Sequence, residues 1–307
     1  MSFLKRSRFL SLLITFFVIT SPVYAATSPG LGQADTFSIL SSSYVNTASG
    51  TTINGDLGYT TGPATAATVN GTVHNVDNVY TQAGIDQGTA LAALNSQSPC
   101  TFTFAPGPIN LATDTTHGPV GSYTPGIYCI TGAASIGGGG TITLTGGGTY
   151  IFRMDGALTT SANSVVALAG GASACNIWWT PTAATTLGAN STFMGTDIDA
   201  SGITIGSTVT WTGRALAFGG TVATTTDTIN TIPACAATSN TNTDRPVVVT
   251  PTPVPVTSGG NGSGSVSTLA GTGKNITTPI IAVVTLLTTS FYLLHLRRKL
   301  GASPLRH

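Results

Sequence analysis

A loose repeat of about twenty residues runs through the middle of the chain. Strand-like segments open successive units at Tyr128, Tyr150, Asn176, Thr196 and Arg214, so the spacings are 22, 26, 20 and 18 residues. Periods of this length, with strand-like content and glycine-rich turns, are typical of β-solenoids in which each unit forms one coil. Such a coil cannot bury its apolar side chains alone, so neighbouring coils must stack.

Alternation along one unit predicts which side chains face the interior of a coil. Segments 203–205 and 209–211 follow the period-2 pattern of a half-buried strand. The side chains expected to point inward are Ile203, Ile205, Val209 and Trp211. Those expected to point outward are Thr204, Thr208 and Thr210. The pairs Thr186-Leu187, Thr204-Ile205 and Thr221-Val222 are expected to be equivalent, so their threonines would stack at a strand spacing of about 4.7–4.9 Å.

Threonine and glycine dominate the composition, while charged residues are scarce. The chain has 56 Thr and 38 Gly among 307 residues, and all ten acidic residues are Asp. This composition favours short strands and tight turns over long surface helices, which favour Glu, Lys and Arg. Between residues 26 and 240, nine Asp and two Arg give a formal charge of 2 − 9 = −7. That balance argues against a nucleic-acid-binding protein, which needs clustered Lys and Arg.

The first 25 residues have the features of a secretory signal peptide. Lys5, Arg6 and Arg8 form a basic start, residues 9–19 are apolar, and Val23-Tyr24-Ala25 is a small-residue cleavage site. The apolar stretch is short for a membrane span, which disfavours the alternative of an uncleaved anchor. We therefore expect residues 26–238 to form an exported domain.

Three further segments follow this domain. Residues 239–275 are a linker rich in Pro, Thr, Gly and Ser. Residues 276–296 are apolar, uncharged and long enough to cross a membrane, and residues 297–307 form a basic tail. By the positive-inside tendency, the tail would lie in the cytoplasm and the domain outside the cell.

The pentapeptide Leu-Ala-Gly-Thr-Gly at residues 269–273 resembles a sortase sorting signal of the LAxTG type. With sortase as a partner, the bond between Thr272 and Gly273 would be cut and Thr272 joined to the cell envelope. A permanent transmembrane anchor is an equal alternative. Either anchor, in the membrane or in the cell wall, would hold the domain at the cell surface.

Four cysteines lie in the expected exported domain, where disulfides are more common than free thiols. They are Cys100, Cys129, Cys175 and Cys235. Three pairings are open, and the one we predict joins nearest neighbours, Cys100 with Cys129 and Cys175 with Cys235. A zinc site is disfavoured, because no two cysteines have ligand spacing and no histidine accompanies them.

Groups suited to catalysis or metal binding are sparse. The expected domain contains only His74 and His117, and it has neither a metal-binding histidine pair nor a nucleophile motif. Asp197-Ile198-Asp199 places two carboxylates on one strand face, but Ca²⁺ usually takes about six or more ligands, so we interpret the pair as a solvated turn. The sequence therefore predicts a protein that is not an enzyme, without a cofactor or a bound metal.

Between residues 76 and 94 the apolar spacing changes to that of a helix. The residues at this spacing are Val79, Ala83, Ala90 and Leu94. Asp77 is a candidate N-cap, whereas Gly84 and Gly88 would each cost about 1 kcal/mol relative to alanine. We expect one long α-helix packed alongside the β structure.

Seven segments match one protein family in order and spacing. They are 34–40, 53–58, 123–128, 149–159, 176–179, 185–188 and 213–217. Together they resemble the microbial ice-binding protein family, an ice-binding-like adhesive domain, over about residues 30–235. The resemblance implies an all-β-dominated fold, a discontinuous β-solenoid of triangular cross-section with one long α-helix beside it. In that fold, segment 53–69 forms coils beside the C-terminal ones.

The resemblance also implies adsorption to ice through one flat face carrying a loose Thr-Ala/Gly-x-Thr/Asn motif. Segments 187–190, 205–208 and 222–225 fit its small-residue and Thr/Asn positions, but each begins with an aliphatic residue. The preceding threonine would supply the missing hydroxyl. The candidate ice-binding residues are Thr159, Ser161, Asn163, Thr186, Asn190, Thr192, Thr204, Thr208, Thr210, Thr221 and Thr225.

The expected function is ice binding at the cell surface, with the ice crystal as partner and slower ice growth or recrystallisation as the result. A surface adhesin for a polysaccharide or another cell is one alternative, which exposed aromatic side chains on the same face would favour. A structural envelope domain without a ligand is another, which bulky or charged residues interrupting the threonine columns would favour.

Overall fold

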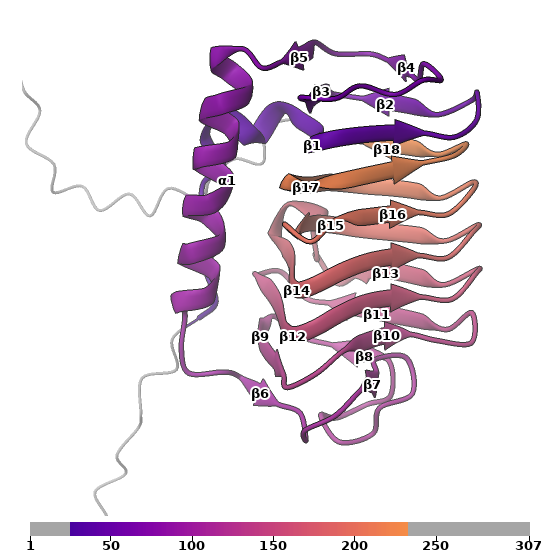
Figure 1. The fold of residues 1–307 in the computed structure, drawn as a ribbon. Helices are drawn as coiled ribbons and strands as arrows, with labels where there is room; N and C mark the ends of the chain where they lie inside the picture. Colours follow the sequence, from indigo (N-terminus) through magenta and orange to yellow (C-terminus); the bar gives the residue numbers. More distant parts are fainter. Residues whose placement is uncertain (1–24, 233–307) are drawn as a thin grey trace, which may run out of the picture. The chain divides into compact units, whose positions relative to one another are not determined.

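The computed structural model describes residues 25–232, which form a stack of β coils with one α-helix alongside (Figure 1). The strands pair in parallel from coil to coil, so equivalent strands form three faces. We number the faces in the order in which the chain visits them within a coil, and the first face lies beside the helix. The expected β-solenoid with a flanking helix is confirmed.

Long strands bend across more than one face. The first face consists of β5 (Val73–Asn75), β3 (Asp56–Tyr59), the start of β1 (Phe37–Asn46), the middle of β17 (Thr210–Thr224), the end of β15 (Thr192–Ile198), the starts of β14 (Ile177–Leu187) and β12 (Tyr150–Thr160), β9 (Gly126–Ile130) and β6 (Phe102–Thr103). The second face consists of the ends of β1, β17, β14 and β12 with β16 (Ile203–Ile205), β10 (Ala134–Ile136) and β7 (Ile109–Asn110). The third face consists of β4 (Thr68–Val69), β2 (Thr52–Asn54), β18 (Thr228–Asn230), the starts of β17 and β15, β13 (Val165–Ala169), β11 (Thr141–Thr145) and β8 (Ser122–Tyr123).

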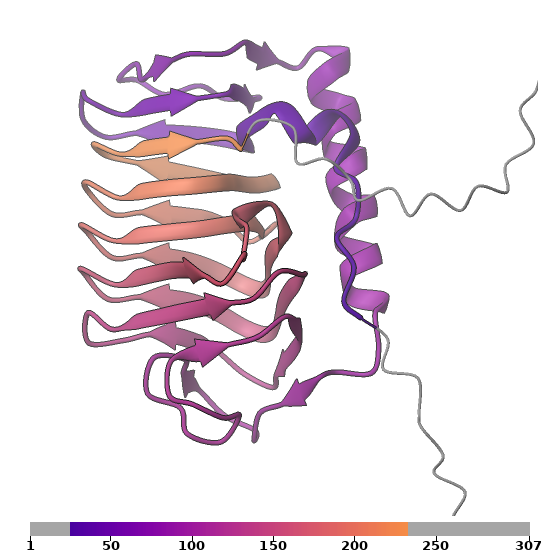
Figure 2. The ribbon, with the colours of Figure 1, turned by 180° about the vertical axis from the view of Figure 1, so that it is seen from behind.

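The order of stacking departs from the order of the chain at β1. Ile39 in β1 lies opposite Ala215 in β17 on one side and opposite Leu57 in β3 on the other. On the third face, β2 lies between β18 and β4. The C-terminal strands therefore stack directly on the N-terminal ones (Figure 2). This confirms the discontinuous winding that the family resemblance implies.

Helix α1 (Asn78–Ser96) covers the first face. The Asp77 carboxylate accepts a hydrogen bond from the backbone N–H of Tyr80 at 2.8 Å, so the predicted N-cap is confirmed. The helix begins and ends two residues later than expected. Its start is delayed because Val76 has a φ of 54°, in the left-handed region, and lies outside it. The buried helix residues are Tyr80, Ala83, Gly84, Gln87, Ala90 and Leu94.

The interior of the solenoid is filled by the side chains that alternation predicts. The predicted inward residues, all at most 2 % exposed, are Ile203, Ile205, Val209 and Trp211. A row of stacked rings runs from coil to coil, with Phe152 4.4 Å from Trp179 and 5.0 Å from Tyr128 between ring centroids. Because these contacts continue along the stack, the coils share one apolar core.

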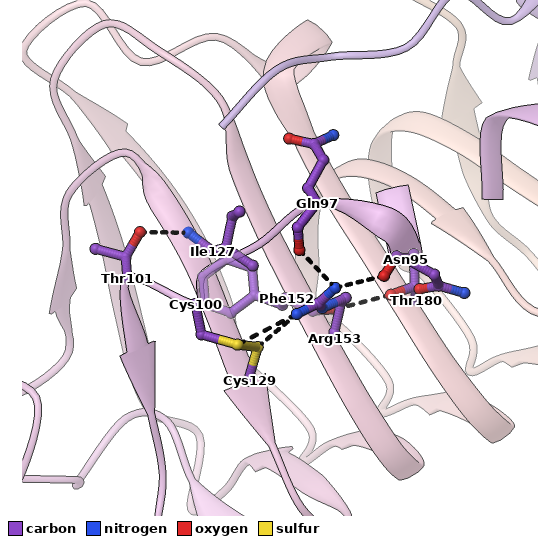
Figure 3. Close-up of a disulfide and its surroundings, with 9 residues drawn as sticks. All are labelled: Asn95, Gln97, Cys100, Thr101, Ile127, Cys129, Phe152, Arg153 and Thr180. Atoms are coloured by element: carbon purple, nitrogen blue, oxygen red, sulfur yellow. Dashed lines mark hydrogen bonds between the residues drawn. A yellow bond between two sulfur atoms is a disulfide. The ribbon is translucent and has the colours of Figure 1, made fainter. Parts of the chain in front are cut away.

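The C-terminal end of α1 is joined to the solenoid by Arg153 and a disulfide (Figure 3). Arg153 Nη1 donates to the carbonyl oxygens of Asn95 at 2.7 Å and Gln97 at 2.9 Å. Its Nη2 lies 2.9 Å from the Cys129 sulfur. The predicted Cys100–Cys129 disulfide is confirmed. The second predicted pair includes Cys235, which lies outside the described residues.

Several sequence predictions concern parts of the chain outside residues 25–232. These are the signal segment up to residue 24, the linker 239–275, the sorting motif, the apolar segment 276–296 and the basic tail 297–307. Within the described range, no helix is both long and apolar enough to cross a membrane.

Candidate functional site

A column of hydroxyl-bearing side chains runs along the outside of the second face. Thr186 in β14 lies opposite Thr204 in β16 on one side and Thr159 in β12 on the other, and all three are exposed. Ser135 in β10 and Asn110 in β7 continue the column at half-buried positions. The structure therefore brings three predicted site residues into one line, each a strand spacing from the next.

The edge between the second and third faces holds another group of predicted residues. Asn163, Asn190 and Thr208 have φ values of 62°, 58° and 62°, so they turn the chain instead of lying in a strand. The left-handed conformation suits asparagine but is unusual for a β-branched threonine. The Thr208 hydroxyl donates to the side-chain oxygen of Asn190, which links two coils. The predicted outward position of Thr208 is confirmed, but the residue lies in the turn between β16 and β17 and not in a strand.

Ser161 and Thr225 also belong to this edge. The Ser161 hydroxyl accepts a hydrogen bond from the backbone N–H of Gly138 at 3.0 Å. The backbone N–H of Thr225 donates to Asp227 at 2.8 Å. Both residues therefore help to fix the turns beside the threonine column.

Thr192 and Thr210 lie on the third face, where they are direct neighbours. The same column continues through Thr228, Thr52 and Thr68, which are in register from coil to coil. None of these three residues is among the candidate ice-binding residues predicted above, although segment 65–68 fits the family's Thr-Ala-x-Thr pattern. The repeated tripeptides Thr52-Ile53-Asn54 and Thr228-Ile229-Asn230 were the signal that could have found two of them, because identical tripeptides in adjacent coils place like residues side by side.

The third face also carries a ladder of asparagines next to its threonine column. Asn54 donates to the side-chain oxygen of Asn230 at 2.6 Å and accepts from Asn70 at 2.7 Å. Each side-chain amide in this ladder has a partner in the next coil. The ladder therefore holds the first and last coils of the chain in register.

Two expected equivalences between units are wrong. Thr204 pairs with Ala223, so Thr221 lies in the neighbouring column of the second face, opposite Ser43. The register between β1 and β17 shifts between Ser41 and Ser43, where β17 bulges at residues 218–220 and moves the later residues along.

The second error concerns the first face. Tyr128 pairs with Phe152, whereas Tyr150 lies opposite Gly126. Tyr128, Phe152 and Trp179 continue the row of stacked rings, and this stacking fixes the register.

The outward positions of the second-face and third-face columns carry neither charged nor aromatic side chains. Arg214 is buried and pairs with Asp35 at 2.6 Å, beside the helix. Asp227 is fully buried at the edge, and burial raises its pKa although the backbone N–H groups of Thr225 and Val209 donate to it. The hydroxyl-bearing columns therefore present an uncharged surface.

The interpretation of Asp197 and Asp199 as a solvated turn is wrong. Asp197 lies opposite Trp179 and Ala215, and its side chain points into the solenoid. Asp197 is 0 % exposed and Asp199 is 1 % exposed. The helix-covered first face is buried on both sides of its strands, so a polar residue there does not imply contact with solvent.

A family model and two relatives of known name all point to ice-binding proteins. Residues 39–230 match the family model described as Ice-binding-like. A protein of Nostoc sp. (strain HG1) named ice-binding protein is 31 % identical over 232 residues, which cover 73 % of this chain and 81 % of the relative. One of the same name from Flavobacterium frigoris (strain PS1) is 31 % identical over 201 residues, 61 % of this chain and 71 % of the relative.

Solved structures agree with these matches. The ice-binding protein of the Antarctic ascomycete Antarctomyces psychrotrophicus superposes with a TM-score of 0.61 at 28 % identity, covering 68 % of this chain and 100 % of that chain. The Arctic yeast protein LeIBP shares the fold, with a TM-score of 0.57 at 23 % identity over 67 % of this chain and 96 % of that chain. The chain belongs to the Ice-binding-like family.

Proposed function

We propose that this protein binds ice and acts without catalysis. The relatives named as ice-binding proteins support the activity, and the in-register column Thr159–Thr186–Thr204 is the observation that supports the surface. We assign the second-face column and the adjoining edge, with Asn163, Asn190 and Thr208, as the ice-contacting surface. The third-face column is the competing surface, because its threonines run in register through more coils.

The physical basis is the arrangement of water over an ordered array. Threonine methyl groups order the water above them while hydroxyl groups anchor it, so a patch of ice-like water can merge with the crystal. Individual water-mediated contacts are weak, and ordering a bridging water costs up to about 2 kcal/mol. Affinity therefore has to come from many matched sites on a rigid scaffold. The stacked coils and the Cys100–Cys129 disulfide supply that rigidity.

A charged side chain would hold water in a geometry unlike that of ice, so the uncharged columns suit this role. Adsorbed molecules would make the ice front curve between contacts and slow its growth. Exposed aromatic side chains would favour polysaccharide adhesion, and none lies at the outward column positions described above. A ligand-free structural domain is disfavoured because neither charged nor bulky aromatic residues interrupt the three second-face threonines.

We also propose that the domain is exported and held at the cell surface. The signal-like segment 1–25 and the apolar segment 276–296 support this location. Detection of Thr272 joined to envelope material by mass spectrometry would support sortase, whereas an intact C-terminus in the membrane fraction would support a transmembrane anchor.

The ice-binding proposal is tested by measuring thermal hysteresis and recrystallisation inhibition of the purified full chain. Thr186→Tyr places a bulky ring in the second-face column, Thr208→Tyr in the edge and Thr210→Tyr in the third-face column. Thr89→Tyr on the exposed side of α1 is the matched control. We expect Thr186→Tyr and Thr208→Tyr to lose activity at unchanged circular dichroism, while Thr89→Tyr keeps it.

Loss confined to Thr210→Tyr would move the ice-contacting surface to the third face. An intact protein without any effect on ice crystals at high concentration would reject ice binding altogether.

A further inference from the structure

The segment Asp197-Ile198-Asp199-Ala200-Ser201-Gly202 resembles the first half of an EF-hand calcium loop, with Ser201 at position 5, where that loop has Asp or Asn. That loop takes side-chain oxygens at positions 1, 3 and 5 and requires glycine at position 6 for a sharp turn. Gly202 has a φ of 117°, so the turn is made here too. The backbone N–H of Ser201 donates to Asp199 Oδ1 at 2.8 Å and closes the turn.

Both carboxyl groups lie inside the solenoid with unused oxygen atoms. Asp197 is fully buried between Trp179 and Ala215 of the neighbouring coils, and Asp199 is 1 % exposed. Both side-chain oxygens of Asp197 and Oδ2 of Asp199 have no hydrogen-bond partner. Unpartnered buried acceptors of this kind are rare in folded proteins, so each needs an explanation.

A third side chain from the adjoining coil faces the same place. Thr185 in β14 is 0 % exposed, and its hydroxyl oxygen also has no hydrogen-bond partner. The hydroxyl lies near enough to both carboxyl groups to lower their pKa values, although burial acts more strongly and raises both. The backbone N–H of Thr185 donates to the Gly202 carbonyl at 3.0 Å, which fixes β14 against the turn.

Within residues 25–232, no positive charge compensates the charge on this pair. Among the groups that act on either carboxyl, the described residues include no cationic side chain. Arg214, on the next coil, directs Nη2 to Asp35 on the helix side of the first face. Two buried carboxylates without a positive partner are strongly unfavourable, so the native state must take up either a cation or a proton.

We propose that Asp197, Asp199 and Thr185 bind one Ca²⁺ ion inside the solenoid. The four unpartnered oxygen atoms are hard ligands of the type Ca²⁺ takes, and backbone carbonyls or water complete its flexible coordination. Mg²⁺ fits less well, because it demands near-octahedral geometry and gives up water reluctantly.

Two differences from an EF-hand indicate modest affinity for this site. Ser201, at position 5, is exposed and donates to the Thr182 carbonyl, so Thr185 takes its place as a ligand. No third Asp, Glu, His or Cys within residues 25–232 joins the two aspartates. We expect a dissociation constant of about 10⁻⁴–10⁻³ M, as in extracellular calcium modules.

The proposed site lies directly behind the second-face column. Thr185 precedes the exposed Thr186, and the turn at 199–202 leads into β16, which carries Thr204. A bound ion would therefore fix the spacing between these two coils. Calcium binding can be measured without an ice assay, so the test of this proposal is separate from the test of ice binding.

The test uses the purified full chain, stripped of metal with a chelator and then titrated with Ca²⁺. We expect Tm to rise by about 5 °C or more at a hundredfold excess over the dissociation constant. Tb³⁺ should bind in place of Ca²⁺ and show luminescence sensitised by Trp179, the neighbour of Asp197 in the next coil. Added Ca²⁺ should abolish that luminescence.

Asp197→Asn and Asp199→Asn remove one charge each at nearly constant volume and should abolish both responses. Asp155→Asn, at an exposed aspartate of β12, is the control and should leave both unchanged. If the site variants fail to fold by circular dichroism, the Tb³⁺ titration of the unaltered chain decides alone. A Tm unaffected by about 10 mM Ca²⁺, ten times the weakest expected dissociation constant, would overturn the proposal. A metal-independent Tm that falls as pH rises would also overturn it and would assign a shared proton to the pair.

Discussion

The backbone of Gly84 in α1 lies directly against the aromatic ring of Phe218 in β17. A Cβ atom at position 84 would stand 2.5 Å from the nearest ring carbons, closer than any normal contact. Gly88, one turn later in the same helix, has no neighbouring atom within 4 Å of a Cβ at its position. The two glycines therefore have different roles, although helix propensity assigns the same cost to both.

This difference predicts opposite effects of the same substitution. Gly84→Ala should destabilise the protein by about 1–3 kcal/mol, because the helix or the Phe218 ring must shift. Gly88→Ala should stabilise it by up to about 1 kcal/mol, because alanine is the better helix former and meets open space. Urea unfolding of both variants measures the two changes. Equal effects of the two substitutions would show that α1 does not pack on β17 as described.

Arg153 is expected to stabilise the last turn of α1. It donates to the carbonyl oxygens of Asn95 and Gln97, which have few other partners at a helix end. Arg153→Met keeps much of the apolar stem but removes these donors, and should cost about 1–3 kcal/mol. Hydrogen exchange should become faster in the last turn of α1 and stay unchanged in β16, far from this contact. Unchanged exchange at residues 92–97 would contradict the role.

The loop between β7 and β8 should make the free energy of unfolding depend on pH in the acid range. Burial raises the pKa of Asp114, but hydrogen bonds from His117 and Thr116 outweigh it and hold the pKa below its usual value. A carboxyl group whose pKa is lowered by folding stabilises the folded state at pH values above its ordinary pKa of about 4. This stabilisation is lost as the pH falls through the folded-state pKa. Asp114→Asn should lower stability at pH 7 and flatten the acid side of the profile. Asp155→Asn, at an exposed aspartate, should leave that profile steep.

The repeat and the alternation within it predicted the parts of the fold that depend on local pattern. Trp211 and Ile203 point inward because a strand alternates its sides, and Asp77 caps the helix because its side chain accepts a nearby backbone N–H. The stacking of β1 on β17 joins residues far apart in the sequence, and only the family resemblance implied that arrangement.

The candidate site was predicted less completely, for reasons visible at individual residues. Thr221 misses the expected column because β17 bulges before it, and a bulge cannot be read from spacing alone. Thr208 and Asn190 turn the chain at the edge in the left-handed conformation, which the threonine repeat alone does not predict. Asp197 is buried because its side chain points into the solenoid, and the helix covers the other side of its strand, so neither side of β15 faces solvent there.

The two chemical parts of a threonine in the second-face column can be separated at Thr186. Thr186→Val keeps the branched shape and removes the hydroxyl, whereas Thr186→Ser keeps the hydroxyl and removes the methyl. Since the side chain is exposed, both variants should keep the free energy of unfolding within about 0.5 kcal/mol of the original. If methyl groups order water and hydroxyl groups anchor it, both variants should lose part of the recrystallisation inhibition.

The matched control for this pair is Thr89 on α1, which is exposed and outside the column. Thr89→Val and Thr89→Ser should keep full recrystallisation inhibition. Full activity of Thr186→Ser would show that the methyl group has no part in ordering water. Full activity of Thr186→Val would show that the hydroxyl group does not anchor water. Full activity of both would remove Thr186 from the ice-contacting surface and leave the third-face column as the surface to test next.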